Sequence, residues 1–444
     1  MKKTVCKDSF AKSVAKTHEE LVVKRGNKPL KAYVIDDGWQ DVGKDADWSK
    51  EVWTVNTKFD PDFKHSFKAA KMADSDLGLW LSPGCNFGAK VIVPKLKTYG
   101  FEALDNWMSL AGPKYMQLLE DRMVGLANDG VSYFKLDGLF GHLNVRDFDL
   151  HGDKHGFPYM SQLDLDGFRS DDKRLNDSKY DELKIYYLTA GSERLMELFG
   201  KVSEANPDVY IVISNGAWLS PWWLMHIDSV WMINAGDAAQ GSSRTNELVY
   251  RDSVYYQIWT KEKTHYPMNS LFNHEPKKRA TGEDADVFRK YLYMNMSRGT
   301  GFIELYIKTF ILSDSDWDVL SEGLHWAQEM FPTFKRSRIH GGSPKKRQTY
   351  GFTAWTGQQG YVSIHNPSDE EQVYTFTLDR EFGLIPDSGE FNLSSPMADS
   401  LIGLQKKYSY GDKITITMAA KEIRILNFDK KVRDWKVIKD LQNN

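Results

Sequence analysis

Short runs of apolar, β-branched and aromatic residues alternate with longer amphipathic segments up to about residue 335. Near-continuous apolar runs such as VYIVIS (209–214) are typical of strands that are buried on both faces of a parallel sheet. Eight such runs alternate with segments of helical spacing, which predicts an α/β fold with a (β/α)8 TIM barrel. An open, doubly wound sheet is the rival interpretation, but no GxGxxG turn follows the first run. The eight strand-like runs are residues 31–36, 77–82, 101–106, 131–137, 209–214, 229–234, 265–270 and 301–306.

The pattern changes after residues 331–348, a basic connector that contains glycine and proline. The runs beyond it alternate with period 2 and are separated by turn residues, which predicts a C-terminal antiparallel β-sandwich. We therefore expect a catalytic barrel over residues 1–335, a β-sandwich over 345–430 and a tail over 431–444. A long polar insertion at about 139–183 interrupts the barrel rhythm, and loops of this length are usually functional or disordered.

Polar and aromatic side chains follow several of the predicted barrel strands. The chemistry of a TIM barrel lies at the carboxyl ends of its strands, so these residues are expected to converge on one rim. Lys135 and Asp137 are two residues apart and therefore on the same face of their strand. The residues expected at the rim are Asp36, Asp37, Trp80, Lys135, Asp137, Asn215, Trp218, Asn234 and Asp237. Histidines and carboxylates show no metal-ligand spacing, so we expect the acids to act directly, without a metal or a cofactor.

Most glycoside hydrolases catalyse their reaction with two carboxyl groups that face each other across a pocket. Asp137 on a rigid strand suits the nucleophile, and Lys135 beside it would keep it ionised. Asp237, on a looser glycine-containing loop, suits the acid that protonates the departing oxygen. Asp36 and Asp37 have no basic neighbour in the sequence, and hydroxyl groups of a sugar would supply donors to both. A turn or helix-cap role for that pair, a structural ion pair of Lys135 with Asp137, and a plain loop position for Asp237 are the structural alternatives.

The composition and net charge of the chain limit the classes of partner that we expect. Hydrophobic residues make up 41% of the 444 positions and the formal charge is −3, which gives no electrostatic reason to expect nucleic acid or a membrane as partner. Aromatic residues reach 13%, which favours a carbohydrate or aromatic ligand, although a large core explains them equally well. Cys6 and Cys85 are too few for a disulfide framework, and the N-terminal residues lack the apolar core of a signal peptide. We expect a cytoplasmic enzyme, and a chain trimmed at its N-terminus would look the same.

Four motifs in order along the chain carry a family resemblance: YVIDDGWQ (33–40), LGLWLSPG (77–84), YFKLDG (133–138) and WMINAGDA (231–238). Over roughly residues 30–335 the chain resembles the α-galactosidase clan of glycoside hydrolases, and in particular family 36. This resemblance implies that Asp137 is the nucleophile of a retaining double displacement and that Asp237 is the acid/base. It also implies that Lys135 contacts the 3- and 4-hydroxyls of the sugar and that Asp36 and Asp37 hold the 4- and 6-hydroxyls.

Departures from the family pattern leave some alternatives open. SNGAWLSPWW (214–223) replaces the cysteine- and glycine-rich turn that lies near the sugar's C2, so galactose and N-acetylgalactosamine are both candidates. Asn234 replaces the first aspartate of the usual acid/base pair, which leaves Asp228 as a distant rival of Asp237. We expect a retaining exo-glycosidase that acts on an oligosaccharide or glycoconjugate with a terminal α-galactosyl-type sugar. The alternatives are an α-N-acetylgalactosaminidase, a raffinose-synthase-type transglycosylase and a non-catalytic sugar-binding relative, and a homo-oligomer is compatible with each.

Overall fold

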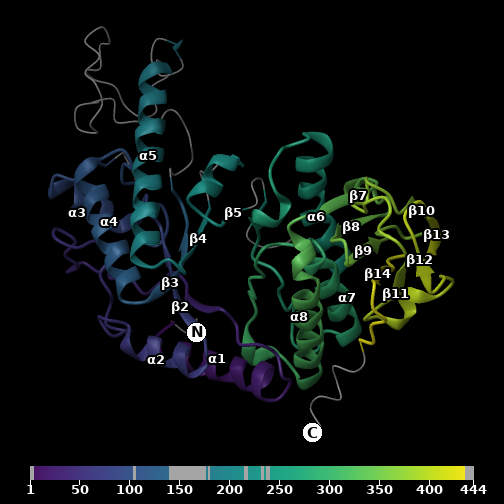
Figure 1. Ribbon diagram of the computed structural model, residues 1–444. Helices are drawn as coiled ribbons and strands as arrows, with labels where there is room; N and C mark the ends of the chain where they lie inside the picture. The colour runs from purple at the N-terminus through teal and green to yellow at the C-terminus, as the bar shows by residue number, and fades with distance from the viewer. Residues whose placement is uncertain are drawn as a thin grey trace. The chain divides into compact units, whose positions relative to one another are not determined.

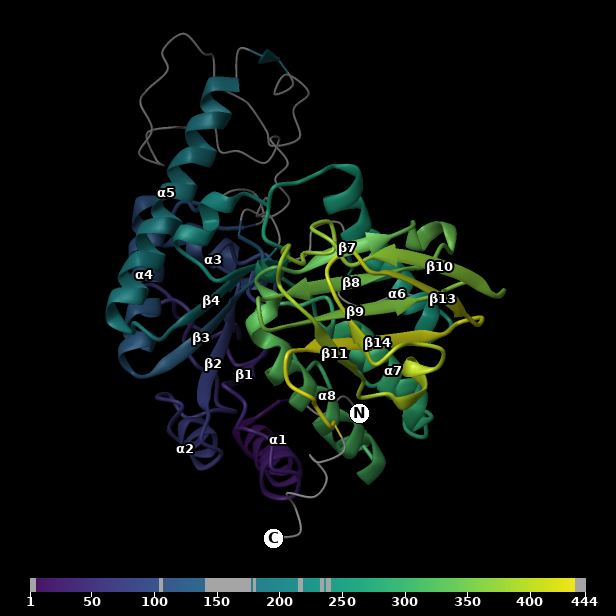
Figure 2. The same ribbon diagram turned by 45° about the vertical axis from the view of Figure 1, so that its right-hand side comes forward.

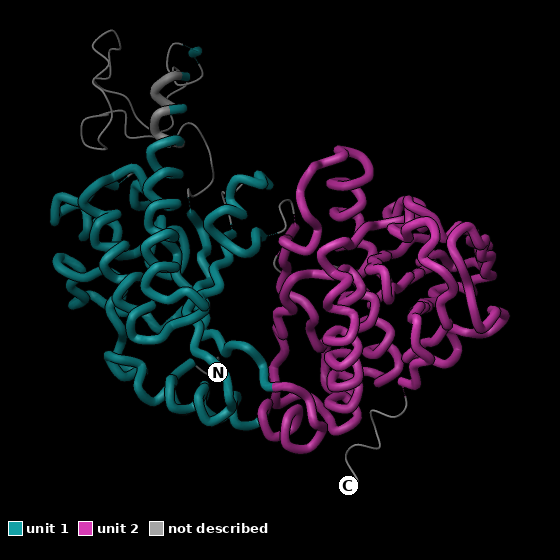
Figure 3. Tube along the Cα trace, in the orientation of Figure 1, with its two compact units in different colours: residues 1–16, 29–231 teal, residues 17–28, 232–444 magenta. Residues whose placement is uncertain are grey.

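The structure is a computed structural model, and it forms two compact units (Figure 3). Unit 1 comprises residues 1–16 and 29–231, and unit 2 comprises residues 17–28 and 232–444. The boundary at residue 231 falls within the range that the sequence assigns to one barrel. The residues that the structure describes are 5–103, 107–139, 177–178, 181–214, 219–231, 235–236 and 241–435.

Unit 1 contains a parallel sheet whose strands are neighbours in chain order (Figure 1). In β1 only Ile35 is buried, but β2 to β5 are almost wholly buried, as in β2, where each residue after Asp76 is buried. Such strands need apolar residues on both faces, which is why they read as continuous apolar runs rather than as alternating ones. The strands are β1 (Ala32–Ile35), β2 (Asp76–Leu81), β3 (Val131–Leu136), β4 (Tyr210–Ile213) and β5 (Ser229–Trp231).

Helices connect these strands, as the alternating pattern predicts. In α4 a proline occupies the first helical position, where its missing N–H costs nothing, and the buried Met116, Leu119, Met123 and Leu126 form one apolar face. This helix contacts both α5 and β3. The first helix, α1 (Lys7–His18), continues into the short π-helix η1 (Glu19–Val23), whose residues belong to unit 2. The others are α2 (Lys64–Met72), η2 (Lys90–Ile92), α3 (Val93–Thr98), α4 (Pro113–Asn128), α5 (Asp181–Ala205) and η6 (Pro221–Met225).

Three of the eight expected strands are wrong or displaced. In 101–106 the described part makes one isolated bridge, between Ala103 and Met108, and β2 pairs directly with β3, so no strand lies between them. The KLDG motif therefore lies at the end of the third strand of the sheet rather than the fourth. Residues 265–270 end in the 3-10 turn η8 (Met268–Ser270), and the strand β6 (Leu271–Phe272) begins only after it. Residues 301–306 form no strand. Apolar runs of this length do not by themselves distinguish a strand from an extended loop.

The helical part of unit 2 precedes its β-sheets. Ser313 and Asp316 form a capping box at the start of α8, where each side chain accepts the other's backbone N–H. The elements are α6 (Arg244–Tyr256), η7 (Gln257–Lys261), α7 (Ala285–Met296), η9 (Thr309–Ile311) and α8 (Asp314–Phe334). In the described ranges, no helix has both the length and the apolar character to cross a membrane.

The C-terminal part consists of two antiparallel sheets, in the orders β12-β11-β14-β9-β8-β7 and β10-β13, which confirms the antiparallel strands predicted after residue 345. The strand β7 lies before that residue, within the range expected to be a connector. In β13, Ile414, Ile416 and Met418 are buried and alternate with exposed residues, as a one-sided strand requires. The strands are β7 (Arg338–Gly341), β8 (Tyr350–Trp355), β9 (Gln359–His365), β10 (Gln372–Thr377), β11 (Phe391–Ser394), β12 (Lys407–Tyr408), β13 (Lys413–Met418) and β14 (Ile423–Asp429), with the turns η10 (Pro344–Lys346) and η11 (Ala398–Leu401).

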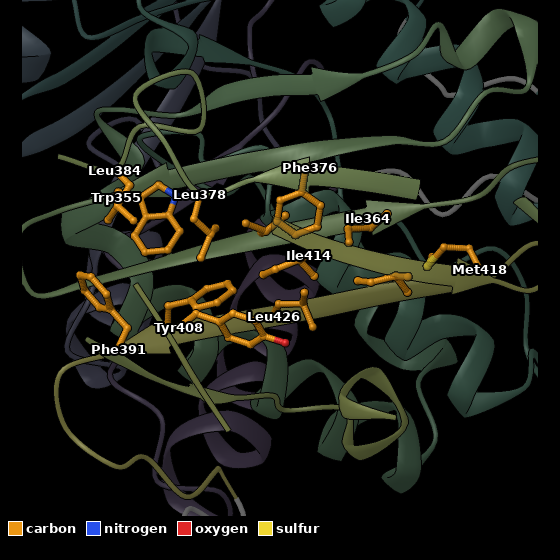
Figure 4. Close-up of a cluster of buried hydrophobic side chains, with 13 residues drawn as sticks. Trp355, Ile364, Phe376, Leu378, Leu384, Phe391, Tyr408, Ile414, Met418 and Leu426 are labelled. Atoms are coloured by element: carbon orange, nitrogen blue, oxygen red, sulfur yellow. The ribbon is translucent and has the colours of Figure 1, made fainter. Parts of the chain in front are cut away.

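An apolar cluster joins these two sheets (Figure 4). It includes Trp355, Ile364, Phe376, Ile414 and Leu426, which come from five different strands. Helices α7 and α8 cover the larger sheet elsewhere (Figure 2). Trp326 of α8 donates its indole N–H to the Asn427 side chain at 3.1 Å and packs edge-on against Tyr361 at 5.2 Å. The larger sheet is therefore buried on both faces, which explains why every residue of β8 and β14 is buried.

Candidate functional site

The candidate site lies at the carboxyl ends of β1, β3 and β4 in unit 1. All three strands run parallel, so their carboxyl ends meet at one edge of the sheet. Asp36 and Asp37 directly follow β1, Asp137 directly follows β3, and Ser214 directly follows β4. The register places Trp80 of β2 beside Lys135 of β3.

Lys135 forms an ion pair with Asp36 across the sheet. Its Nζ donates to Asp36 Oδ2 at 3.1 Å, and the two residues are 99 positions apart in the sequence. The Lys135 side chain is 5% exposed, whereas that of Asp36 is 41% exposed. The backbone N–H of Asp37 donates to the other oxygen, Oδ1, at 2.9 Å. Asp36 thus has its charge partly compensated by protein donors, and its exposed surface lets a carboxylate oxygen accept more hydrogen bonds from a ligand.

Asp37 is exposed, and Gln40 orients it. Gln40 Nε2 donates to Asp37 Oδ1 at 2.6 Å and to the carbonyl oxygen of Gly88 at 2.9 Å, while Gln40 Oε1 accepts the N–H of Gly38 at 3.0 Å. Gly88 has a φ of +63°, and a Cβ there would lie 2.3 Å from Asp37 Oδ1 and 2.4 Å from Gln40 Nε2. Glycine is therefore required at 88 for the loop after β2 to approach this carboxylate. Sequence reasoning missed both Gln40 and Gly88.

Trp80 is held among other aromatic residues and is 3% exposed. Its ring packs edge-on against Trp53 at 6.1 Å, and its carbonyl oxygen accepts the indole N–H of Trp39 at 2.8 Å. These contacts belong to the core of unit 1, so packing accounts for most of the surface of Trp80. Its predicted contact with a sugar stays a prediction.

Asp137 is half-buried and hydrogen-bonded at both its backbone and its side chain. Its N–H donates to Leu81 O at 2.8 Å, which ties the end of β3 to the end of β2. Ser214 Oγ donates to Asp137 Oδ1 at 2.6 Å. Ser214 is itself fixed, because its N–H donates to Leu136 O at 2.7 Å. The carboxylate is therefore oriented from a neighbouring strand, as a strand-borne nucleophile requires. The same strand-end rule that selected Asp137 would have found Ser214 after the VYIVI run.

Gly138, after the candidate nucleophile, has a conformation that favours glycine. Its φ is +64°, and a Cβ would lie 2.8 Å from the Phe87 ring and 3.0 Å from Asn86 Cβ. Its carbonyl oxygen accepts the N–H of Gly84 at 3.2 Å. The loops after β2 and β3 therefore pack closely at this edge because the KLDG and SPG motifs carry glycine where they meet.

The remaining predicted site residues, Asn215, Trp218, Asn234 and Asp237, lie outside the described residues. The rival acid Asp228 directly precedes β5, and its Oδ2 accepts the N–H of Ile211 near the start of β4 at 2.8 Å. It thus lies toward the amino ends of these strands, opposite to the candidate site, which speaks against a catalytic role. In the part of the chain that the structure describes, no group of three or more His, Cys, Asp and Glu residues is arranged to hold a metal ion.

The fold is that of known glycoside hydrolases. No protein-family model and no curated protein sequence matches the chain. Solved structures do match it. α-Galactosidase I from Mortierella vinacea is 13% identical, with a TM-score of 0.56, over 96% of this chain and 93% of that one. The family 36 α-galactosidase AgaA from Geobacillus stearothermophilus is 12% identical, with a TM-score of 0.61, over 96% of this chain and 53% of that one. A putative α-N-acetylgalactosaminidase from Bacillus halodurans is 9% identical, with a TM-score of 0.58, over 96% and 94%.

These neighbours include members of families 27 and 36, among them a family 27 β-L-arabinopyranosidase from Geobacillus stearothermophilus at 11% identity. At such identities the likeness shows a shared fold. The same fold occurs in α-galactosidases and in a putative α-N-acetylgalactosaminidase, and it does not distinguish between the two families.

Proposed function

We propose that this chain is a retaining exo-glycosidase that releases terminal α-linked galactose-type residues. The observation that carries the proposal is the Asp36–Lys135 ion pair beside the Ser214-oriented Asp137, all on the carboxyl ends of parallel strands in a fold shared with α-galactosidases. Sugar recognition needs acceptors and donors for adjacent hydroxyls, and Asp36, Asp37 and Lys135 supply both kinds.

The proposed reaction is a double displacement. Asp137 attacks the anomeric carbon, the bond to the aglycone oxygen breaks, and Asp237 gives its proton to that oxygen. A covalent glycosyl ester on Asp137 results. Asp237, now a carboxylate, takes a proton from water as the water oxygen attacks the anomeric carbon, which releases the sugar with its original configuration and regenerates both acids. Retention requires the two carboxyl groups to lie about 5–5.5 Å apart.

The other predicted residues have binding roles in this proposal. Asp36 and Asp37 hold the 4- and 6-hydroxyls, and Lys135 contacts the 3- and 4-hydroxyls. Trp80, Asn215 and Trp218 line the sugar subsite. We further propose a closed (β/α)8 barrel over 1–335, with its insertion at about 139–183, followed by the β-sandwich over 345–430 and a tail over 431–444. Membership of family 36 is part of the same proposal.

A second candidate substrate is a terminal α-linked N-acetylgalactosamine. The putative α-N-acetylgalactosaminidase from Bacillus halodurans supports it, since this protein shares the fold over nearly its whole length. The space beside C2 of the sugar would decide between the two substrates. The segment expected there, SNGAWLSPWW, differs from the family pattern. Transfer of the sugar to a second sugar would use the same covalent intermediate.

The test is a side-by-side assay of an aryl α-galactoside and an aryl α-N-acetylgalactosaminide, with proton NMR of the first sugar anomer released. We expect hydrolysis of one of the two with the α-anomer appearing first, and a loss of at least about 10⁴-fold in kcat for Asp137→Ala. A first product of β configuration would refute retention. An Asp137→Ala variant as active as the parent would refute the nucleophile. If an added acceptor sugar captures most of the glycosyl group, the protein is a transglycosylase.

A further inference from the structure

The backbone that leads into Asp237 is held by helix α6 of unit 2. Gly236 donates its N–H to the Tyr250 hydroxyl at 2.9 Å, and Gly236 O accepts a hydrogen bond from Arg251 Nη1 at 3.0 Å. The carbonyl of Gly236 belongs to the peptide bond that joins it to Asp237. Two adjacent residues of one helix therefore fix both peptide groups that flank Gly236.

We propose that Tyr250 and Arg251 are positioning residues for the acid/base step at Asp237. This inference rests on the proposed function, because it takes Asp237 as the acid/base. Gly236 has no side chain, so the protein can form hydrogen bonds to this residue only through its peptide groups. Tyr250 and Arg251 would act through that backbone.

The Arg251 side chain is held in place because it is wholly buried and its guanidinium group also donates to Glu275. It is 0% exposed, and its Nε donates to Glu275 Oε1 at 3.4 Å. Glu275 is in turn held by Asn295 at 2.7 Å and by Arg298 at 2.6 Å. Because the same guanidinium group donates to Glu275 and to Gly236, it cannot freely follow the Gly236 peptide, so the peptide is tied to the buried interior of the unit.

This anchor extends further into the core. Arg298, also 0% exposed, donates to Asp252 Oδ1 at 2.7 Å, and Asp252 Oδ2 accepts the Tyr350 hydroxyl at 2.6 Å. Asp252 follows Arg251 in α6, and Tyr350 begins β8. The support for the Gly236 peptide therefore runs from α6 through the loop after β6 and the end of α7 to the C-terminal sheet.

The chemistry explains why such support matters. Asp237 would act twice, first as an acid toward the leaving oxygen and then as a base toward water, and both steps need hydrogen-bond reach. Small displacements of a catalytic group have large kinetic costs, so groups of this kind are held by neighbouring side chains that are themselves locked. A loosened Asp237 would matter most where the leaving group needs its proton.

The decisive variant is Tyr250→Phe, which removes only the hydroxyl that accepts the Gly236 N–H. We expect kcat for an unactivated galactoside, or galactosaminide if that is the substrate, to fall about tenfold, since one hydrogen bond of this kind is lost. The kcat for an aryl glycoside with a strongly acidic leaving group should fall less than about twofold, because its departure needs little protonation. Tyr256→Phe, on the same helix, is the matched control and should leave both rates unchanged.

Arg251→Lys is the second variant, since it keeps the positive charge beside Glu275 while shortening the reach toward Gly236. It should show the same dependence on the leaving group, with an unchanged pattern of products. If this variant does not fold, Tyr250→Phe decides alone. A Tyr250→Phe enzyme that loses activity equally on both substrates, or on neither, would overturn the inference.

Asp237→Asn separates this inference from the proposed function. A large, leaving-group-dependent loss in Asp237→Asn with no such dependence in Tyr250→Phe would refute the positioning role alone. The absence of leaving-group dependence in Asp237→Asn itself would refute Asp237 as the acid, and with it the premise of the inference.

Discussion

Two groups of carboxylates in this protein contrast in their surroundings. Asp36 in unit 1 has 41% of its side chain exposed and forms an ion pair with Lys135. Asp252 and Glu275 in unit 2 are 0% and 4% exposed, and they form ion pairs with two buried arginines, Arg251 and Arg298. Both groups contain acids paired with a cation. The difference is that water reaches the first group and is excluded from the second.

Burial sets the protonation behaviour of the second group. It raises the pKa of Asp252, and the attraction of Arg298 offsets only part of that effect. Burial acts in the same direction on Glu275, but Arg298 and Arg251 outweigh it and lower the pKa of that residue. The two buried arginines and the two buried acids pair with one another, so each charge needs its partner. A carboxylate at a solvated strand end can still accept hydrogen bonds from a ligand, whereas the oxygens of a buried carboxylate already accept hydrogen bonds from the protein.

The largest expected effect comes from breaking the buried set. Asp252→Asn should lower the free energy of unfolding by about 3–5 kcal/mol, because it leaves Arg298 buried without one of its two anions. Asp137→Asn should change it by less than about 1 kcal/mol while abolishing activity. Urea denaturation followed by tryptophan fluorescence measures both. Equal losses of stability in the two variants would show that the strand-end acid is structural as well.

Asp36→Asn tests the other side of the comparison. A hydrogen bond between a charged acceptor and a sugar hydroxyl contributes about 1.5–3 kcal/mol, so kcat/KM should fall about 10- to 100-fold. The urea midpoint should stay nearly unchanged, since asparagine still offers Lys135 an oxygen. Asp369→Asn, at a side chain that is 92% exposed, is the control and should leave kcat/KM as it is. Parent-like kcat/KM in Asp36→Asn would remove this residue from the site.

His365 extends the comparison to pH. It is 0% exposed, its Nδ1 lies 3.0 Å from the Tyr350 hydroxyl, and burial, reinforced by Lys421 and Arg347, lowers its pKa to about 3. Between that value and the ordinary pKa of about 6.5, the unfolded state binds a proton that the folded state does not, so stability falls as pH falls.

From pH 7 to pH 5 this histidine should cost about 2 kcal/mol of unfolding free energy. Denaturation curves at the two pH values measure the loss, and it should shrink by that amount in His365→Asn. His65→Asn, at an exposed histidine, should retain the full loss. An identical pH dependence in His365→Asn and the parent would contradict the prediction.

The smallest effect is expected at a solvated ion pair. Lys407 and Glu390 lie 2.6 Å apart, with side chains 56% and 54% exposed. Lys407→Ala should change the free energy of unfolding by less than about 1 kcal/mol, because water screens the pair and already solvates both charges. A loss as large as that of Asp252→Asn, in the same urea titration, would mean that exposure does not separate the two kinds of ion pair.

Several features of the fold were predictable because they depend on local pattern. The parallel strands read as continuous apolar runs and β13 as an alternating one, since burial on two faces or one face sets the side-chain period. Strands β8 and β14 are buried throughout, although the sequence predicts alternating strands in this region. The failures were also local. GFIELY has four apolar residues in six, as does the true strand segment LGLWLS, and FEALDN has three. Only the direct pairing of β2 with β3 shows that FEALDN contributes no strand between these two.

For β1, β3 and β4 the sequence by itself determined which residues follow or end the strands, and so placed Asp36, Asp37, Lys135 and Asp137 at the candidate site. It also placed glycine at 138, where the chain takes a positive φ. The tertiary structure alone decided the partners: Lys135 for Asp36, Ser214 for Asp137 and Gln40 with Gly88 for Asp37. Most of these pairs join residues far apart in the chain, and a hydrogen bond depends on distance and direction in space, which strand register and loop geometry set and residue order does not.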